Sequence, residues 1–89
     1  MIYTIHGLKI SKGTNRTTNK EFNFVKFYAT FTSPDRYVIG SEVKEFIVQR
    51  DRLSNYSDED LKKLIGYDVD FEIVPYNDRV VYTGINQVL

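Results

Sequence analysis

Residues 57–73 read SDEDLKKLIGYDVDFEI, and this stretch changes from a helical pattern to a strand pattern at its glycine. Ser57 before three acidic residues is typical of a helix N-cap and first turn, with Asp60 near the capping-box position. The next positions form one apolar stripe, namely Leu61, Leu64 and Ile65. Gly66 stands where a left-handed C-cap belongs. Residues 68–73 then alternate between acidic and apolar. The stretch therefore predicts a helix of two to three turns followed by a half-buried strand.

Strand and turn patterns account for the other residues. Before the helix, strands are expected at residues 2–10, 21–32 and 37–50, with a loop at residues 11–20 and a turn at Ser33–Arg36. After it, the strand in residues 67–74 is followed by a turn at Pro75–Asp78 and a last strand over residues 79–89. The order is three strands, one helix and two strands. It predicts a mainly β fold, the OB-fold, which is a five-stranded Greek-key barrel with its helix between strands three and four. The alternative is another small barrel or an open α+β sheet.

The composition fits one small domain, which we place at residues 1–89. The chain has no cysteine, so neither disulfides nor thiolate metal sites can supplement the core. No segment has the apolar length of a signal peptide or a membrane span, so a cytoplasmic protein is expected. The net charge is zero, but residues 1–50 carry eight Lys/Arg against four Asp/Glu, and residues 51–89 carry the reverse. This asymmetry is a hint of a polyanion-binding face.

The sequence has few of the residues and motifs that catalysis requires. It has a single histidine, His6, no cysteine and no glycine-rich phosphate cradle. Its carboxylates gather at the helix start and on the wet face of a strand, without a partner base. We expect a non-enzymatic protein that needs neither a metal nor another cofactor.

The strongest strand, residues 21–32, separates into two faces by parity. One face lacks charge and should be core: Val25, Phe27, Ala29 and Phe31. The other mixes aromatic rings with a lysine and should meet solvent or a partner: Phe22, Phe24, Lys26, Tyr28 and Thr30. Large apolar side chains left exposed usually mark a contact surface.

Basic loops should flank this aromatic face, because the loops after strands one and four border the ligand face of an OB barrel. Cations can hold phosphates while unpaired bases stack on rings, at roughly 1–3 kcal/mol per base and with weak sequence preference. The candidate nucleic-acid-binding residues are Lys12, Arg16, Lys20, Phe22, Phe24, Lys26, Tyr28, Arg36, Tyr76 and Arg79. The alternative interpretation is that Phe22 and Phe24 cap an open barrel end or pack in a homodimer, and that the cations only solubilise the loops.

The chain also resembles a known class of proteins. Its length and plan are similar to those of the filamentous-phage helix-destabilising proteins, with TNKEFNFVKF (residues 18–27) as the matching stretch. VKFYAT (25–30) and LKKLIGYDVDFEI (61–73) resemble segments of the bacterial single-strand-binding proteins. The resemblance implies that Phe22 and Phe24 contact bases and that Arg16 and Lys20 lie near phosphates. It also implies a homodimer that coats single-stranded DNA in phage or plasmid replication or recombination.

Two other functions share these features. OB-folds also serve as protein-interaction modules, and the aromatic face would then contact a protein. Single-stranded RNA offers the same stacking surfaces as single-stranded DNA. Competition between the two kinds of oligonucleotide would separate these possibilities.

Overall fold

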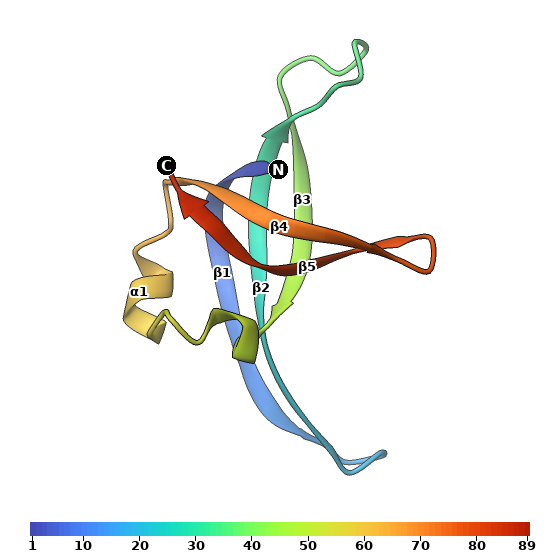
Figure 1. Ribbon diagram of the computed structural model, residues 1–89, viewed down its shortest axis with the longest axis vertical. Coiled ribbons are helices and arrows are strands. Elements are labelled where there is room, and N and C mark those ends of the chain that lie inside the picture. The colour runs from blue at the N-terminus through green and yellow to red at the C-terminus, as the bar shows by residue number, and fades with distance from the viewer.

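Five strands form one antiparallel sheet in the computed structural model, which describes residues 1–89 (Figure 1). The elements are β1 (Ile2–Asn15), β2 (Lys20–Thr32), β3 (Ser41–Gln49), a 3-10 helix η1 (Arg50–Leu53), α1 (Asp58–Lys62), β4 (Asp68–Tyr76) and β5 (Arg79–Val88). The strand order is β3-β2-β1-β4-β5, so β3 and β5 are the edges of an open sheet. These two edge strands nevertheless contact each other. The prediction of a mainly β fold with one short helix between the third and fourth strands is confirmed.

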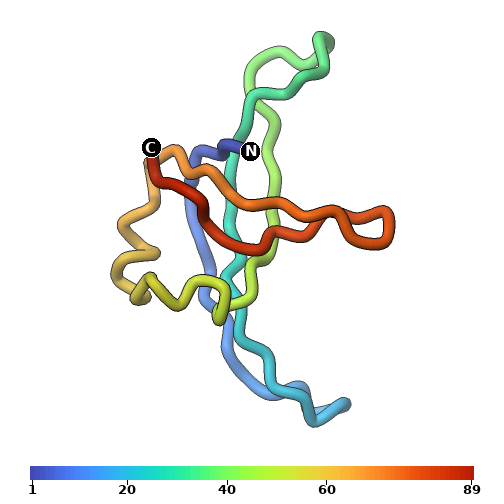
Figure 2. Tube along the Cα trace, viewed as in Figure 1, coloured from blue at the N-terminus to red at the C-terminus, as the bar shows by residue number.

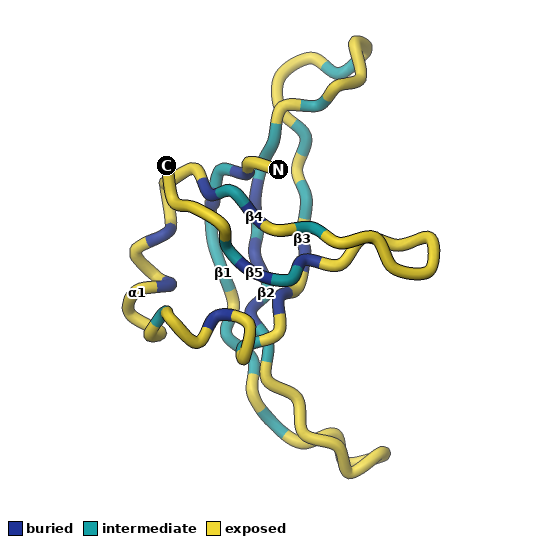
Figure 3. Tube along the Cα trace, viewed as in Figure 1, coloured by how far each residue is buried: buried dark blue, intermediate teal, exposed yellow.

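The core is an aromatic cluster enclosed by the curved sheet. Thirteen buried apolar residues form it, and Figure 3 shows the buried positions on the strands and on the helical segment beside them, while the projecting ends are mostly exposed. The rings of Phe46 and Tyr82 stack with centroids 4.0 Å apart, which joins the two edge strands. The hydroxyls of Tyr3 and Tyr82 share a buried hydrogen bond of 2.8 Å. Burial raises the pKa of the Tyr3 hydroxyl, and the hydrogen bond to Tyr82 adds to this rise.

The β1–β2 hairpin is longer than predicted. Residues 11–15 were expected in a flexible loop, but β1 continues to Asn15 and pairs with β2 back to Lys20. The turn is only residues 16–19, where the Asn15 side chain accepts the backbone N–H groups of Thr17 and Thr18. Asn19 adopts the left-handed conformation at φ 56°, which asparagine tolerates. The basic segment is therefore a two-stranded arm rather than a loop (Figure 2).

Two other boundaries differ from the prediction. Residues 37–40, expected in a strand, belong to the β2–β3 connection, where Asp35 caps the Tyr37 N–H and Gly40 has φ +87°. Pro75 and Tyr76, expected in a turn, are the last residues of β4. The turn itself is only Asn77–Asp78, and both residues have positive φ, which is typical of a type I′ hairpin.

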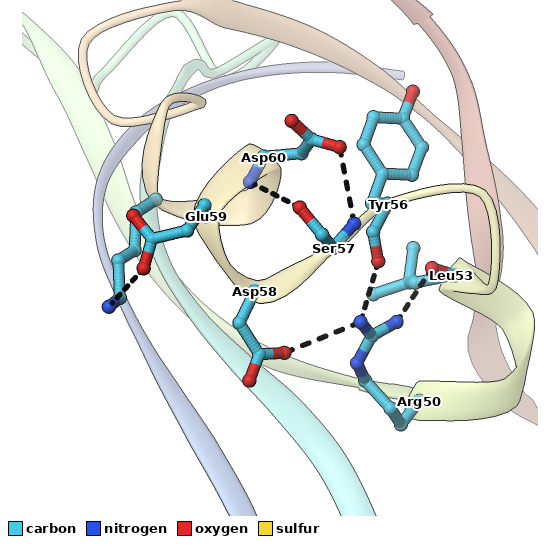
Figure 4. Close-up of polar contacts among 8 residues, drawn as sticks. Arg50, Leu53, Tyr56, Ser57, Asp58, Glu59 and Asp60 are labelled. Atoms are coloured by element: carbon cyan, nitrogen blue, oxygen red, sulfur yellow. Dashed lines mark hydrogen bonds and ion pairs between the residues drawn. The ribbon is translucent and has the colours of Figure 1, made fainter.

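The segment between β3 and β4 confirms the predicted capping box and corrects the helix length. The Ser57 hydroxyl accepts the Asp60 N–H at 3.1 Å, and the Asp60 carboxylate accepts the Ser57 N–H (Figure 4). The helix has only five residues, so Ile65 lies beyond it and is exposed, contrary to the predicted apolar stripe. Gly66 has the predicted left-handed conformation, at φ +91°, but it is not the C-cap: the C-cap is Lys63, and the Gly66 N–H donates to the carbonyl oxygen of Ile5 on β1.

The sequence patterns did not predict η1, and Arg50 fixes it to the helix. The Arg50 guanidinium donates to the carbonyl oxygens of Leu53 and Tyr56, both at 2.6 Å, and to the Asp58 carboxylate at 3.3 Å (Figure 4). Leu53 and Leu61 are buried against the sheet. This arrangement closes the end of the core from which the β1–β2 hairpin projects (Figure 1).

Candidate nucleic-acid interface

Three projections extend from the core: the β1–β2 hairpin, the connection at residues 33–40 and the β4–β5 hairpin (Figure 1). The molecule measures 45 × 31 × 19 Å, and its radius of gyration is 14.2 Å. A spherical domain of this length would have a radius of gyration of about 12 Å. We call the hairpin formed by residues 10–24 the β1–β2 arm. It extends from the end of the sheet opposite the residue 33–40 connection (Figure 2).

The two faces of β2 are those predicted from parity. Val25, Phe27 and Ala29 are buried, whereas Phe24 is half-buried and Phe22 is 40% exposed. The rings of Phe22 and Phe24 lie 5.9 Å apart at an interplanar angle of 37°. Neither residue belongs to the core cluster. The two rings form an aromatic pair on the outward face of β2, at the base of the arm.

Glycines on β1 allow the aromatic rings of β2 to lie against the neighbouring strand. Gly13 pairs with Phe22, and a Cβ added at Gly13 would lie 2.8 Å from the Phe22 Cζ atom. Gly7 pairs with Tyr28 in the same way, with a ring carbon 3.6 Å from the added Cβ. Because Phe22 rests on Gly13, its ring is positioned before any ligand binds, which lowers the entropic cost of stacking.

A hollow of about 810 Å³ lies beside the aromatic pair. It forms where β3 ends, since Gln49 is the last β3 residue paired with β2 and lies opposite Phe24. Beyond that point β2 has no neighbour on this side. Among the residues that line the hollow are Lys12, Glu21, Phe22, Phe24, Gln49 and Asp51. The hollow thus combines a ring surface, one cation and several hydrogen-bonding groups.

Three of the predicted cations lie along the arm and form no ion pair. Lys20 begins β2 and shares the face of Phe22 and Phe24 by alternation. Lys12 pairs with Asn23 on the other face, yet it lines the same hollow. Arg16 lies in the tip of the arm. All three are exposed, so their charges are available to an anionic ligand.

Lys26 is engaged by a neighbour on the outward face. Its Nζ atom lies 3.0 Å from Glu45 Oε2 on β3 and 5.6 Å from the centre of the Tyr28 ring. The hydrogen bond and the charge of Glu45 raise the pKa of Lys26. Lys26 therefore stays protonated, but Glu45 competes with a phosphate for it.

The remaining predicted residues lie on the other two projections. Arg36 is in the residue 33–40 connection, where its guanidinium lies 4.9 Å from the Tyr37 ring centre and donates to the Tyr37 hydroxyl. Tyr76 and Arg79 face each other across the Asn77–Asp78 turn of the β4–β5 hairpin. The structure does not bring Arg36 together with the residues of the arm. A role for these three residues stays a prediction.

Sequence reasoning missed the outward residues of β3. The pairing of β3 with β2 places Val43, Glu45 and Ile47 on the same face as Tyr28 and Lys26. Val43 is 76% exposed and Ile47 is 46% exposed, so they extend the apolar surface alongside β2. Both parities of SEVKEFIVQ contain charged and apolar residues, so only the register of pairing reveals which face is outward.

Comparisons with protein-family models, with curated proteins and with solved structures found no match. The resemblance to single-stranded-DNA-binding proteins therefore depends on the residues quoted above and on their arrangement.

No group of three or more His, Cys, Asp or Glu side chains is placed to hold a metal ion. Neither helix has the length and apolar character that crossing a bilayer would require.

Proposed function

We propose that this protein binds single-stranded DNA without catalysing a reaction, and that the β1–β2 arm with the outward face of β2 and β3 is the binding surface. The observation that carries the proposal is the outward-facing pair Phe22 and Phe24, the first exposed and the second half-buried, on an arm that bears three unpaired cations. Exposed rings on a folded domain cost free energy unless a partner covers them. Unpaired bases are suitable partners because each has a flat apolar surface.

We also propose that the sheet is that of an OB-fold. The order β3-β2-β1-β4-β5, the contact between β3 and β5 and the helix between β3 and β4 support this assignment. In an OB-fold the outward face of strands two and three binds the ligand, which agrees with the position of the aromatic pair.

Binding would divide between phosphates and bases. Lys12, Arg16 and Lys20 neutralise phosphates along the arm, while Phe22 and Phe24 stack on successive bases. Three phosphate contacts give a slope of about −2 for log K against log salt concentration with a single strand. Stacking needs no base-edge recognition, so largely sequence-independent coating of single strands is the activity that this surface fits best.

A homodimer is part of the proposal. With so few cations, one domain would bind weakly, and two linked sites raise the overall affinity. The β4–β5 hairpin supports self-association because it leaves Val74, Tyr76, Val80 and Val81 exposed. Action in phage or plasmid replication, in the cytoplasm, follows from the family resemblance alone.

The second candidate is a protein-interaction module. Exposed apolar residues extend beyond the aromatic pair to Val43 on β3 and to Ile39 in the β2–β3 connection, which is fully exposed. A protein partner would use this apolar surface without the arm's cations. Single-stranded RNA stays a third possibility, since the same rings and cations would bind it.

The test is a titration of a labelled single strand of mixed sequence, about 12 nucleotides long, followed by fluorescence anisotropy at several salt concentrations. We expect binding that weakens with salt at the slope given above, and that unlabelled duplex competes poorly. Unlabelled RNA of the same sequence is the second competitor. No binding at low salt would refute the proposal and favour the interaction module, and stronger competition by RNA would change the ligand assigned.

A further inference from the structure

The polar groups of the hollow beside Phe24 differ in kind from the cations of the arm. Glu21 and Asp51 contribute carboxylates, and Gln49 contributes an amide. None of these three side chains takes part in a hydrogen bond or an ion pair within the chain. An ionised carboxylate is an acceptor only, whereas an amide can accept or donate. Glu21 alternates to the other face of β2 from Phe22 and Phe24 but lines the same hollow, and Gln49 pairs with Phe24. The lining of the hollow is therefore rich in free hydrogen-bond acceptors.

We propose that this hollow is a subsite for a nucleobase that carries an exocyclic amine, cytosine above all, and that it disfavours thymine and uracil. The inference deepens the proposed function and rests on it. It assigns to Glu21, Asp51 and Gln49 a specificity-determining role that stacking on Phe22 and Phe24 alone would not provide.

The charges determine which part of the strand enters the hollow. The two carboxylates outnumber Lys12, the one cation of the hollow, so its net negative charge disfavours phosphates and the sugar–phosphate backbone should follow Lys20 and Arg16 along the arm. A base that stacks on Phe24 then directs its polar edge toward the acceptors at the end of β3.

The edge of the base determines the preference. Cytosine presents the N4 amine, which a Glu or Asp side chain accepts, and adenine presents the N6 amine. Thymine presents its O4 oxygen at the same position, and two acceptors facing each other without a proton repel. The preference should be about fivefold, the lower end of the range for a base-edge contact, because the carboxylates are exposed to solvent.

The cleanest comparison uses oligo-dC, oligo-dU and oligo-dT of equal length. Cytosine carries an amine at position 4 where uracil carries an oxygen, and the ring nitrogen N3 bears a proton only in uracil. The two rings are otherwise the same, so their stacking is similar. Thymine adds a methyl group that favours stacking. A preference for dC over both dU and dT therefore reports on the polar edge and not on the rings.

The experiment measures the dissociation constants of the three oligomers for the full-length protein and for a Glu21→Gln/Asp51→Asn variant. A Glu59→Gln variant is the control, since it removes one carboxylate from α1, where Glu59 pairs only with Lys62. We expect the wild type and the control to bind dC about fivefold more tightly than dU. In the double variant the ratio should approach one, because dC loses its charged acceptors while dU and dT bind more tightly once the repulsion of their O4 oxygens is removed.

Equal affinity of the wild type for dC and dU would overturn the inference and leave the proposed function intact. A preference for dC that persists in the double variant would also overturn it, because another group would then read the base. If none of the three oligomers binds, the proposed function fails and the inference fails with it.

Discussion

Replacing Phe22 and Phe24 together by alanine should remove most of the affinity for single-stranded DNA and leave the protein folded. Both rings project from the outward face of β2, and neither belongs to the buried cluster of 13 residues. Phe22 is 40% exposed, and its ring lies against Gly13 of β1 and beside the Phe24 ring. The double variant therefore separates the binding surface from the core.

The magnitude follows from the stacking of bases on rings. Each stacked base contributes roughly 1–3 kcal/mol when measured by alanine substitution. We take the lower end because the rings are partly exposed, and two rings then contribute about 2 kcal/mol, or a loss of about 30-fold in affinity. The free energy of unfolding should fall by about 1 kcal/mol or less, since substitutions outside the core have small effects.

The assay is fluorescence anisotropy with the labelled mixed-sequence strand, combined with urea unfolding followed by circular dichroism. Tyr67→Ala is the matched control, because Tyr67 is an exposed ring in the connection between α1 and β4, away from every candidate binding residue. The control should bind as the wild type does. If the folded double variant binds with wild-type affinity, the assignment of the aromatic pair as a base platform is wrong.

Three further substitutions test separate parts of the structure. Glu45→Gln removes the partner of Lys26 and frees this lysine for a phosphate. Fluorescence anisotropy should then show up to about fivefold tighter binding and a salt slope steeper by about 0.7. An unchanged slope would show that Lys26 does not contact the strand. Gly13→Ala should displace the ring that packs against it and weaken binding with little change in urea midpoint; unchanged affinity would argue against a preset ring. Tyr3→Phe leaves the Tyr82 hydroxyl without its partner and should cost about 1–3 kcal/mol of unfolding free energy in urea. Because burial raises the pKa of Tyr3, wild-type stability should also fall as the pH rises above about 10, and a Tyr3→Phe variant with the same fall would contradict this explanation.

Local periodicity was enough to predict several parts of the fold. The alternation in β2 placed Val25 and Phe27 in the core, because one uncharged face of a strand must be buried. The capping box at Ser57 was predictable from four consecutive residues, since both partners belong to the same turn. Both features depend only on residues that are close together in the sequence, so local patterns are enough to predict them.

Features that depend on distant pairing were not predictable in the same way. Residues 11–15 are polar and lack an apolar period, yet the backbone ladder with residues 20–24 holds them in a strand. The outward face of β3 follows from its register with β2, which no local pattern specifies. The spacing of Ile65 from Leu61 fits an apolar helical stripe. However, α1 ends at Lys62, so helical spacing no longer determines which way the Ile65 side chain points.

The same limit applies to the candidate site. The outward aromatic pair and the cations of the arm were predicted from parity and composition. The hollow was not, because it exists only where β3 ends opposite Phe24 while β2 continues, and where η1 places Asp51 beside it. A polar group whose role depends on the end of another strand cannot be recognised from its own neighbours in the sequence.

The central claim is that the β1–β2 arm and the outward face of β2 and β3 together bind single strands. The most direct test is an NMR titration of the isotope-labelled protein with the mixed-sequence strand, which reports the affected backbone amides one by one. The account predicts shifts concentrated at residues 12–24 and 43–49, with α1 unaffected. Shifts confined to the β4–β5 hairpin or to the residue 33–40 connection, or no shifts at all, would contradict it.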